Sequence, residues 1–158
     1  MPKLTPCIWF DTEGEEAAAL YTSIFPNSRI TKVVPYPEGG MREAGTVMTV
    51  EFELDGKPFT ALNGGTQFTP DEAISFQIEC ADQAEIDHYW SALAADGGEE
   101  GPCGWVKDRF GVSWQTVPRR LFELVDGGDP ARAQRVMTAL LDMRKIEIAE
   151  LERAAEAA

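Results

Sequence analysis

One order of predicted elements occurs twice along the 158-residue chain, and this repetition constrains the fold more than any other feature. An apolar helical stripe recurs at a constant offset of 69, with Ala17, Leu20, Tyr21 and Ile24 matched by Ile86, Tyr89, Trp90 and Leu93. Each stripe follows a predicted strand and precedes further strands, which predicts two copies of one strand–helix–strands module. The alternative left open is that two amphipathic helices share a common spacing.

The first copy is predicted over residues 5–65. Residues 5–10 are apolar and short, as in a strand, and residues 12–15 resemble a capping box that begins a helix ending at Pro26. Further strands are predicted at 29–36, 46–54 and 57–63. The alternation of apolar and polar side chains at 46–54 indicates a half-buried strand, and Asp55-Gly56 is typical of a hairpin turn.

The second copy is predicted over residues 73–118. A strand at 73–80 precedes a second capping-box pattern at 82–85, a helix, and a strand pair at 103–110 and 112–117. Residues 119–157 predict further helices, one of them with Asp129 as its N-cap and Pro130 in its first turn. We interpret this segment as an extension that covers a sheet edge or a partner subunit, within a single domain spanning residues 1–158.

The charge balance excludes one class of partner. The chain has 14 Lys and Arg against 27 Asp and Glu, a net charge of −13, so it repels phosphate backbones and anionic membranes, and no nucleic-acid or membrane partner is expected. No secretory signal or membrane-spanning apolar run is visible, and three widely spaced cysteines fit reduced thiols, which predicts a cytoplasmic location. The single histidine, His88, excludes a multi-histidine metal site and lies off the apolar stripe of its helix.

Four stretches resemble a known family: Trp9-Phe10-Asp11 with residues 25–28, residues 61–65, residues 72–76 and residues 103–115. They are similar to the PhnB-like branch of the vicinal oxygen chelate superfamily, which includes glyoxalase and bleomycin-resistance proteins. This branch is often described as 3-demethylubiquinone-9 3-methyltransferase. The likeness extends over nearly the whole chain, including residues 135–151. It implies an α+β fold in which paired βαβββ modules form a glyoxalase-like cleft within a homodimer, with the helical segment appended.

The resemblance also implies where a metal would bind. Metal-using members place one ligand on each of four strands, and those positions correspond here to Thr5 or Cys7, Ala61 or Asn63, Ser75 or Gln77, and Gln115. None of them is a carboxylate or histidine, the ligands that divalent ions prefer. We therefore expect no bound metal and no cofactor, and without a metal the glyoxalase and dioxygenase mechanisms lack their electrophile.

The predicted ligand-binding residues are Asn63, Ser75, Gln77, Cys103, Trp105, Arg109, Trp114 and Gln115. Several have structural alternatives. Asn63 can fix a turn, Cys103 can be an inert thiol, and Arg109 can pair with Asp108. Because Trp114 and Gln115 alternate, only one of them can face a pocket.

The sequence therefore favours a small-molecule-binding protein of this superfamily without a metal, with its activity unassigned. Sequestration of a toxic compound is one form of that function. The alternative is an enzyme, either a methyltransferase as the family description reads or one with metal-dependent vicinal oxygen chelate chemistry.

Overall fold

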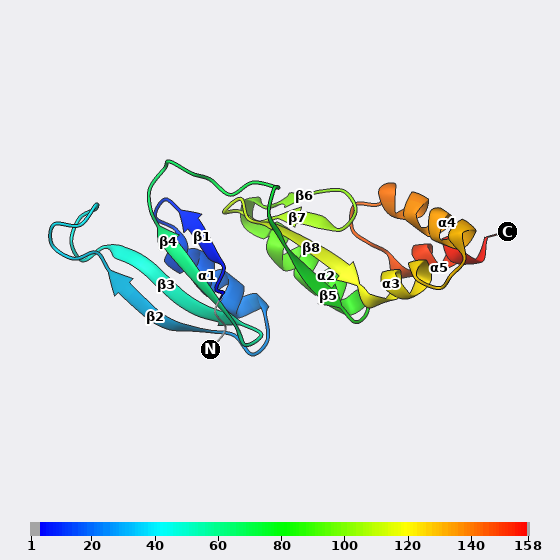
Figure 1. Cartoon of the computed structure of the whole chain (residues 1–158), viewed down its shortest axis with the longest axis horizontal. Coiled ribbons are helices and arrows are strands. Elements are labelled where there is room, and N and C mark those ends of the chain that lie inside the picture. Colours follow the sequence, from blue (N-terminus) through cyan, green and yellow to red (C-terminus); the bar gives the residue numbers. More distant parts are fainter. Residues whose placement is uncertain (1–3, 158) are drawn as a thin grey trace. The chain divides into compact units, whose positions relative to one another are not determined.

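The computed structural model describes residues 4–157 and divides the chain into two compact units, Met1–Pro70 and Asp71–Ala158 (Figure 1). The predicted repeats fall one in each unit. The prediction that the units form a single domain with paired sheets stays a prediction.

The first unit is one βαβββ module. It contains β1 (Cys7–Phe10), α1 (Gly14–Ile24), β2 (Arg29–Pro35), β3 (Val47–Leu54) and β4 (Lys57–Asn63). The strands form one sheet in the order β1-β4-β3-β2, in which β1 runs parallel to β4 and the other pairs are antiparallel. Helix α1 crosses one face of this sheet (Figure 1).

The second unit repeats this topology. It contains β5 (Ser75–Cys80), α2 (Gln83–Ala94), the short 3-10 helix η1 (Ala95–Gly97), β6 (Glu99–Glu100), β7 (Trp105–Lys107) and β8 (Ser113–Pro118). Its sheet has the order β5-β8-β7-β6, again with the first and last strands parallel. The α+β class and the duplicated module are therefore confirmed.

Each helix covers one face of its own sheet, and that face is apolar. In the first unit Phe52 and Ala61 are buried on the α1 side, where the ring centroids of Tyr21 and Phe52 are 6.2 Å apart. In the second unit Cys80 and Trp114 are buried on the α2 side. Because side chains alternate across a strand, the neighbouring residues of each strand lie on the opposite, open face.

The extension forms three helices with a core of their own. These are α3 (Arg119–Val125), α4 (Pro130–Leu141) and α5 (Ile148–Glu156). They enclose a cluster of buried side chains: Val117, Leu121, Leu124, Val136, Leu140, Met143, Ile146 and Leu151. Asp129 caps α4 as predicted, because its carboxylate accepts hydrogen bonds from the N–H groups of Ala131 and Arg132. Within the described part of the chain, no helix combines the length and apolarity that crossing a membrane requires.

The segment between α4 and α5 is hydrogen-bonded to the second module. The amide of Gln83, at the start of α2, donates to the Ile146 carbonyl at 3.0 Å and accepts from the Ile148 N–H at 2.9 Å. The carbonyls of Met143 and Arg144 accept from the N–H groups of Cys103 and Gly104. These bonds attach the extension to both α2 and the turn before β7.

Helix α1 does not begin as predicted, and the capping box at residues 12–15 is wrong. The Glu13 carboxylate accepts from the Thr12 N–H, and the Gly14 N–H donates to Asn63 on β4. At 82–85 the N-cap is confirmed, since Asp82 accepts from the Glu85 N–H, whereas the Glu85 carboxylate accepts from the N–H of Ala81, the residue before the cap. Of the predicted strand at 103–110, only Trp105–Lys107 is extended, because Cys103 and Gly104 adopt positive φ angles.

Replacing Gln83 by alanine tests the attachment of the extension. Gln83→Ala leaves the Ile146 carbonyl and the Ile148 N–H without their partner, and we expect the free energy of unfolding to fall by about 2 kcal/mol. Urea denaturation measures this loss. Gln134→Ala, on the exposed side of α4, is the matched control and should change stability by less than about 0.5 kcal/mol. Equal stability of the two variants would contradict the attachment.

Candidate functional site

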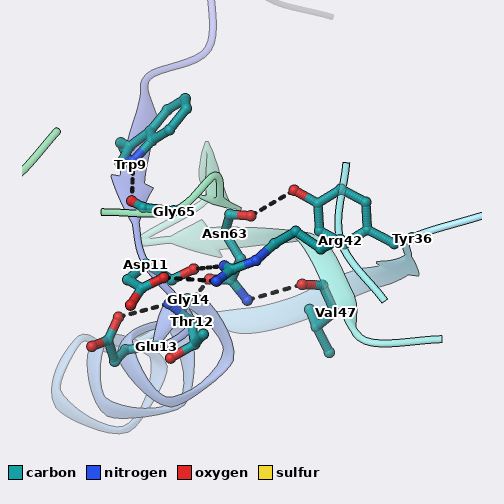
Figure 2. Close-up of polar contacts among 10 residues, drawn as sticks. All are labelled: Trp9, Asp11, Thr12, Glu13, Gly14, Tyr36, Arg42, Val47, Asn63 and Gly65. Carbon is teal, nitrogen blue, oxygen red and sulfur yellow. Dashed lines mark hydrogen bonds and ion pairs between the residues drawn. The ribbon is translucent and has the colours of Figure 1, made fainter. Parts of the chain in front are cut away.

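Asn63 lies at the end of β4, where its side-chain oxygen, its side-chain nitrogen and its backbone carbonyl all take part in hydrogen bonds within the fold (Figure 2). Its side-chain oxygen accepts from the Gly14 N–H at 2.8 Å, and its side-chain nitrogen donates to the Val47 carbonyl at 3.0 Å. Its own carbonyl accepts from the Tyr36 hydroxyl at 2.7 Å. Asn63 is only 4% exposed and faces α1. The structure therefore assigns its amide to helix capping and not to the open face.

The neighbouring residues of the family-like stretches are also structural. The indole N–H of Trp9 donates to the Gly65 carbonyl at 2.7 Å, and a Cβ on Gly64 would overlap the Trp9 ring. Arg42 donates to both the backbone carbonyl and the carboxylate of Asp11, which attaches the loop after β2 to the start of α1 (Figure 2). These contacts connect Trp9, Asp11 and Gly65 to the rest of the first unit.

Asp108 organises the turn between β7 and β8. One carboxylate oxygen accepts from the N–H groups of Phe110 and Val112, and the other accepts from the Trp114 indole N–H at 2.8 Å. Trp114 is 2% exposed, so this predicted ligand residue belongs to the core on the α2 side.

For Arg109 the structure corrects the structural alternative, the pair with Asp108, while its role in ligand binding stays a prediction. The structure pairs its guanidinium with Asp96 at 3.4 Å and places it over the Phe110 ring, 4.9 Å from the centroid. The suggested partner Asp108 instead binds the N–H groups of the turn, as described above.

Four of the predicted residues share the open face of the second sheet. The strand register pairs Gln77 with Gln115 and Gln115 with Trp105, while Ser75 is the partner of Ser113. The Gln115 amide donates to the Ser75 hydroxyl at 2.7 Å. This face therefore carries the hydrogen-bonded Ser75–Gln115 pair, next to the strand position of Trp105. Both members of the pair can donate or accept a hydrogen bond.

A hollow of about 320 Å³ lies at the β6–β7 side of the same face. Glu72, Glu99, Pro102, Trp105, Lys107 and Ser113 contribute to its lining. Ser113 is 2% exposed, and its hydroxyl is buried without a hydrogen-bond partner among the described residues. Because buried hydroxyls are normally satisfied, this group marks a place where a ligand atom can bond.

The charged groups of the hollow are arranged around Lys107. Its ammonium forms an ion pair with Glu72, and this hydrogen bond raises the pKa of Lys107 and lowers the pKa of Glu72. The negative charge of Glu99 acts in the same direction on the Lys107 pKa. The Glu100 carboxylate is turned to the other face, where it accepts from the Trp90 indole N–H at 3.1 Å.

The three cysteines lie in different environments. Cys103 is partly buried against the core of the extension. Cys7 is exposed on β1, and partial burial raises the pKa of its thiol. Cys80 is fully buried, and desolvation, assisted by the charges of Glu85, Asp82 and Glu79, raises its pKa to about 12. His88 is exposed on α2, as predicted.

The positions that correspond to metal ligands do not share one face of the first sheet. Ala61 and Asn63 face α1, whereas Cys7 points to the open side, where Thr60 is its partner on β4. Among residues 4–157, no group of three or more His, Cys, Asp or Glu side chains has an arrangement that could hold a metal ion.

Two βαβββ modules with this strand order define the glyoxalase-like, or vicinal oxygen chelate, class of fold. The family model described as 3-demethylubiquinone-9 3-methyltransferase matches residues 2–117. The PhnB protein from Bacillus cereus is 32% identical, with a TM-score of 0.66, and the match covers 74% of this chain and 99% of that one. The chain belongs to this PhnB-like family.

More distant structures share the fold alone. Protein PA1353 from Pseudomonas aeruginosa is 18% identical over 75% of this chain and 98% of its own, with a TM-score of 0.61. A fosfomycin resistance protein from Listeria monocytogenes is 13% identical over 75% of this chain and 93% of its own, with a TM-score of 0.52. No curated protein matches the chain.

The extent of the family match corrects one expectation. The resemblance was expected to include residues 135–151, but the family model ends at residue 117. Helices α3, α4 and α5 therefore lie outside the part of the chain that the family model describes.

Apart from Trp105, the lining residues of the hollow were missed from the sequence, and the ones that matter most here are Ser113, Lys107 and Glu72. Ser113 and Lys107 lie two residues from the predicted Gln115 and Trp105, so strand alternation alone could have placed them on the same face. Glu72 precedes β5 and carries no such signal, because a loop residue has no fixed side.

Substituting Asn63 tests its capping role. Asn63→Ala leaves the Gly14 N–H and the Val47 carbonyl unpaired, so we expect the free energy of unfolding to fall by about 2–4 kcal/mol. Chemical denaturation measures the change. Gln67→Ala, an exposed amide in the same unit, should change stability by less than about 0.5 kcal/mol. A stability of Asn63→Ala near that of wild type would contradict the assignment.

Cysteine alkylation tests the pKa of Cys80. Thiolates react and thiols do not, so a pKa of about 12 should keep Cys80 unmodified by iodoacetamide at pH 8, while exposed Cys7 reacts. Mass spectrometry of native and urea-unfolded protein measures this, with all three cysteines modified after unfolding. The raised pKa also predicts that stability falls as pH rises above about 9, where the unfolded thiol ionises first. Equal modification of Cys7 and Cys80 in the native protein would show the burial to be wrong.

Proposed function

We propose that the chain binds a small organic molecule in the hollow on the open face of its second sheet, without a metal or other cofactor. The proposal includes the homodimer and the cytoplasmic location that the sequence predicts. The observation that carries it is the buried Ser113 hydroxyl without a partner among the described residues, because leaving such a group unsatisfied costs free energy that a ligand can recover.

The surroundings of Ser113 support binding of a molecule that is partly apolar. The Trp105 ring and Pro102 offer apolar surface, while the hydroxyl and the Lys107–Glu72 pair offer polar contacts. An apolar lining with a few polar groups is typical of small-molecule sites, and the volume of the hollow is near the lower end of their range.

A thermal-shift screen of small organic compounds tests the proposal. Binding to the native state raises the melting temperature, and calorimetry then gives the dissociation constant of each hit. We expect Ser113→Ala to weaken hits that bond to the hydroxyl by about fivefold, the value of one ordinary hydrogen bond. S-adenosylmethionine belongs in the panel, and stabilisation by it alone would overturn the proposal in favour of a methyltransferase.

A second hydroxyl on β8 provides the control. Thr116 is equally buried but faces α2, where its hydroxyl donates to the Gly104 carbonyl at 3.3 Å. Thr116→Val should lose about 1 kcal/mol of stability without changing ligand affinity. Ser113→Ala should keep or gain stability, because the deleted hydroxyl has no partner within residues 4–157. Unchanged affinity of every hit for Ser113→Ala would overturn the proposed location.

A further inference from the structure

We infer that the hollow binds an organic ammonium ion with an apolar body, in preference to an anion of the same shape. This inference rests on the proposed function and adds the chemical class of the ligand. It depends on two independent observations, the unsatisfied hydroxyl of Ser113 and the balance of charge around it.

The charge balance favours a cation. The residues that line the hollow include three glutamates, Glu72, Glu99 and Glu100, and one lysine, Lys107. The Glu100 carboxylate accepts from the Trp90 indole N–H, which leaves Glu72 and Glu99 to be considered. Glu72 already holds Lys107 in an ion pair. Glu99 takes part in no ion pair within residues 4–157, although its charge still acts on Lys107 across the β6–β7 pair. The Glu99 carboxylate is therefore available to pair with a positively charged ligand.

An anion would meet the opposite situation. At Lys107 an anion would share the ammonium group with Glu72, and it would be repelled by the negative charges of Glu72 and Glu99. The net charge of −13 on the chain adds a repulsive field at low ionic strength. Because like charges repel, the hollow should bind an anion more weakly than a cation of the same shape.

The other groups of the hollow suit the remainder of such a ligand. The electron-rich face of an indole attracts cations and also packs against aromatic or aliphatic groups, so Trp105 can contact either end of the molecule. The Ser113 hydroxyl can accept a hydrogen bond from an ammonium group, which has donors and no acceptor. A ligand N–H on Ser113 would satisfy the buried hydroxyl and leave the Lys107–Glu72 pair intact.

Three probes of one shape test the inference: 3-phenylpropylamine, 3-phenylpropanol and 3-phenylpropionate. Calorimetry at pH 7 and low salt should rank the amine above the alcohol and the alcohol above the carboxylate, with the amine about tenfold tighter than the carboxylate. The preference should shrink as salt is raised, because exposed charges are screened. Equal affinities, or a preference for the carboxylate, would overturn the cation inference and leave the hollow as a ligand site.

Two variants, each of which removes one carboxylate charge, test whether Glu99 is responsible for the preference for the amine. Glu99→Gln should weaken the amine by about fivefold and leave the alcohol unchanged, since one exposed ion pair is removed. Glu156→Gln removes the same charge at the exposed end of α5, and should leave both affinities unchanged. Equal effects of the two variants would overturn the role of Glu99. Failure of all three probes to bind, together with a screen without hits, would overturn the proposed function itself.

Discussion

Each half of the chain depends on the alternation of side chains across a four-stranded sheet with a helix on one side only. The helix commits one face to apolar packing, as Phe52 and Tyr21 show in the first unit. The opposite face then carries the intervening residues, and in the second unit these are Ser75, Gln115 and Trp105. One geometric rule therefore decides which polar residues are available to a ligand and which are enclosed.

Buried polar groups define the ends of the modules. Asn63 connects the last strand of the first unit to the start of α1 and to β3, and Asp108 closes the β7–β8 turn in the second. Both use a side chain to satisfy backbone N–H groups that would otherwise lack partners, and such networks are costly to break because the low dielectric penalises an unpaired group. These residues belong to the distinctive stretches of the sequence, yet their function is to fix the fold.

The sequence was sufficient for the duplicated module and for most of the order of elements, because periodicity, turn residues and the cap at Asp82 are local signals, but it missed β6, which has only two residues. The sequence could not show which face of its sheet each predicted ligand side chain lies on. Asn63 and Trp114 face helices, whereas Gln115 lies on the open face, and the difference depends on pairing with strands that are distant in the sequence. Of the predicted ligand residues, Ser75, Gln77, Trp105 and Gln115 lie on the open face of the second sheet, and Trp105 also lines the hollow. Strand alternation places Ser113 on the same face as Gln115, but only the structure shows that its hydroxyl lacks a partner among the described residues, and that Glu72 pairs with Lys107.

The parallel pairing of first and last strands sets the order in which each module can form during synthesis. β1 can pair with its sheet neighbour, β4, only after α1, β2 and β3 have been made, and β5 likewise pairs with β8, which is made last in its module. The β2–β3–β4 meander can assemble from near neighbours, while the β1–β4 contact closes a long loop at an entropic cost. Completion of each sheet is thus the late, non-local step, and the residues that complete the open face of the second unit come together only when β8 has joined β5.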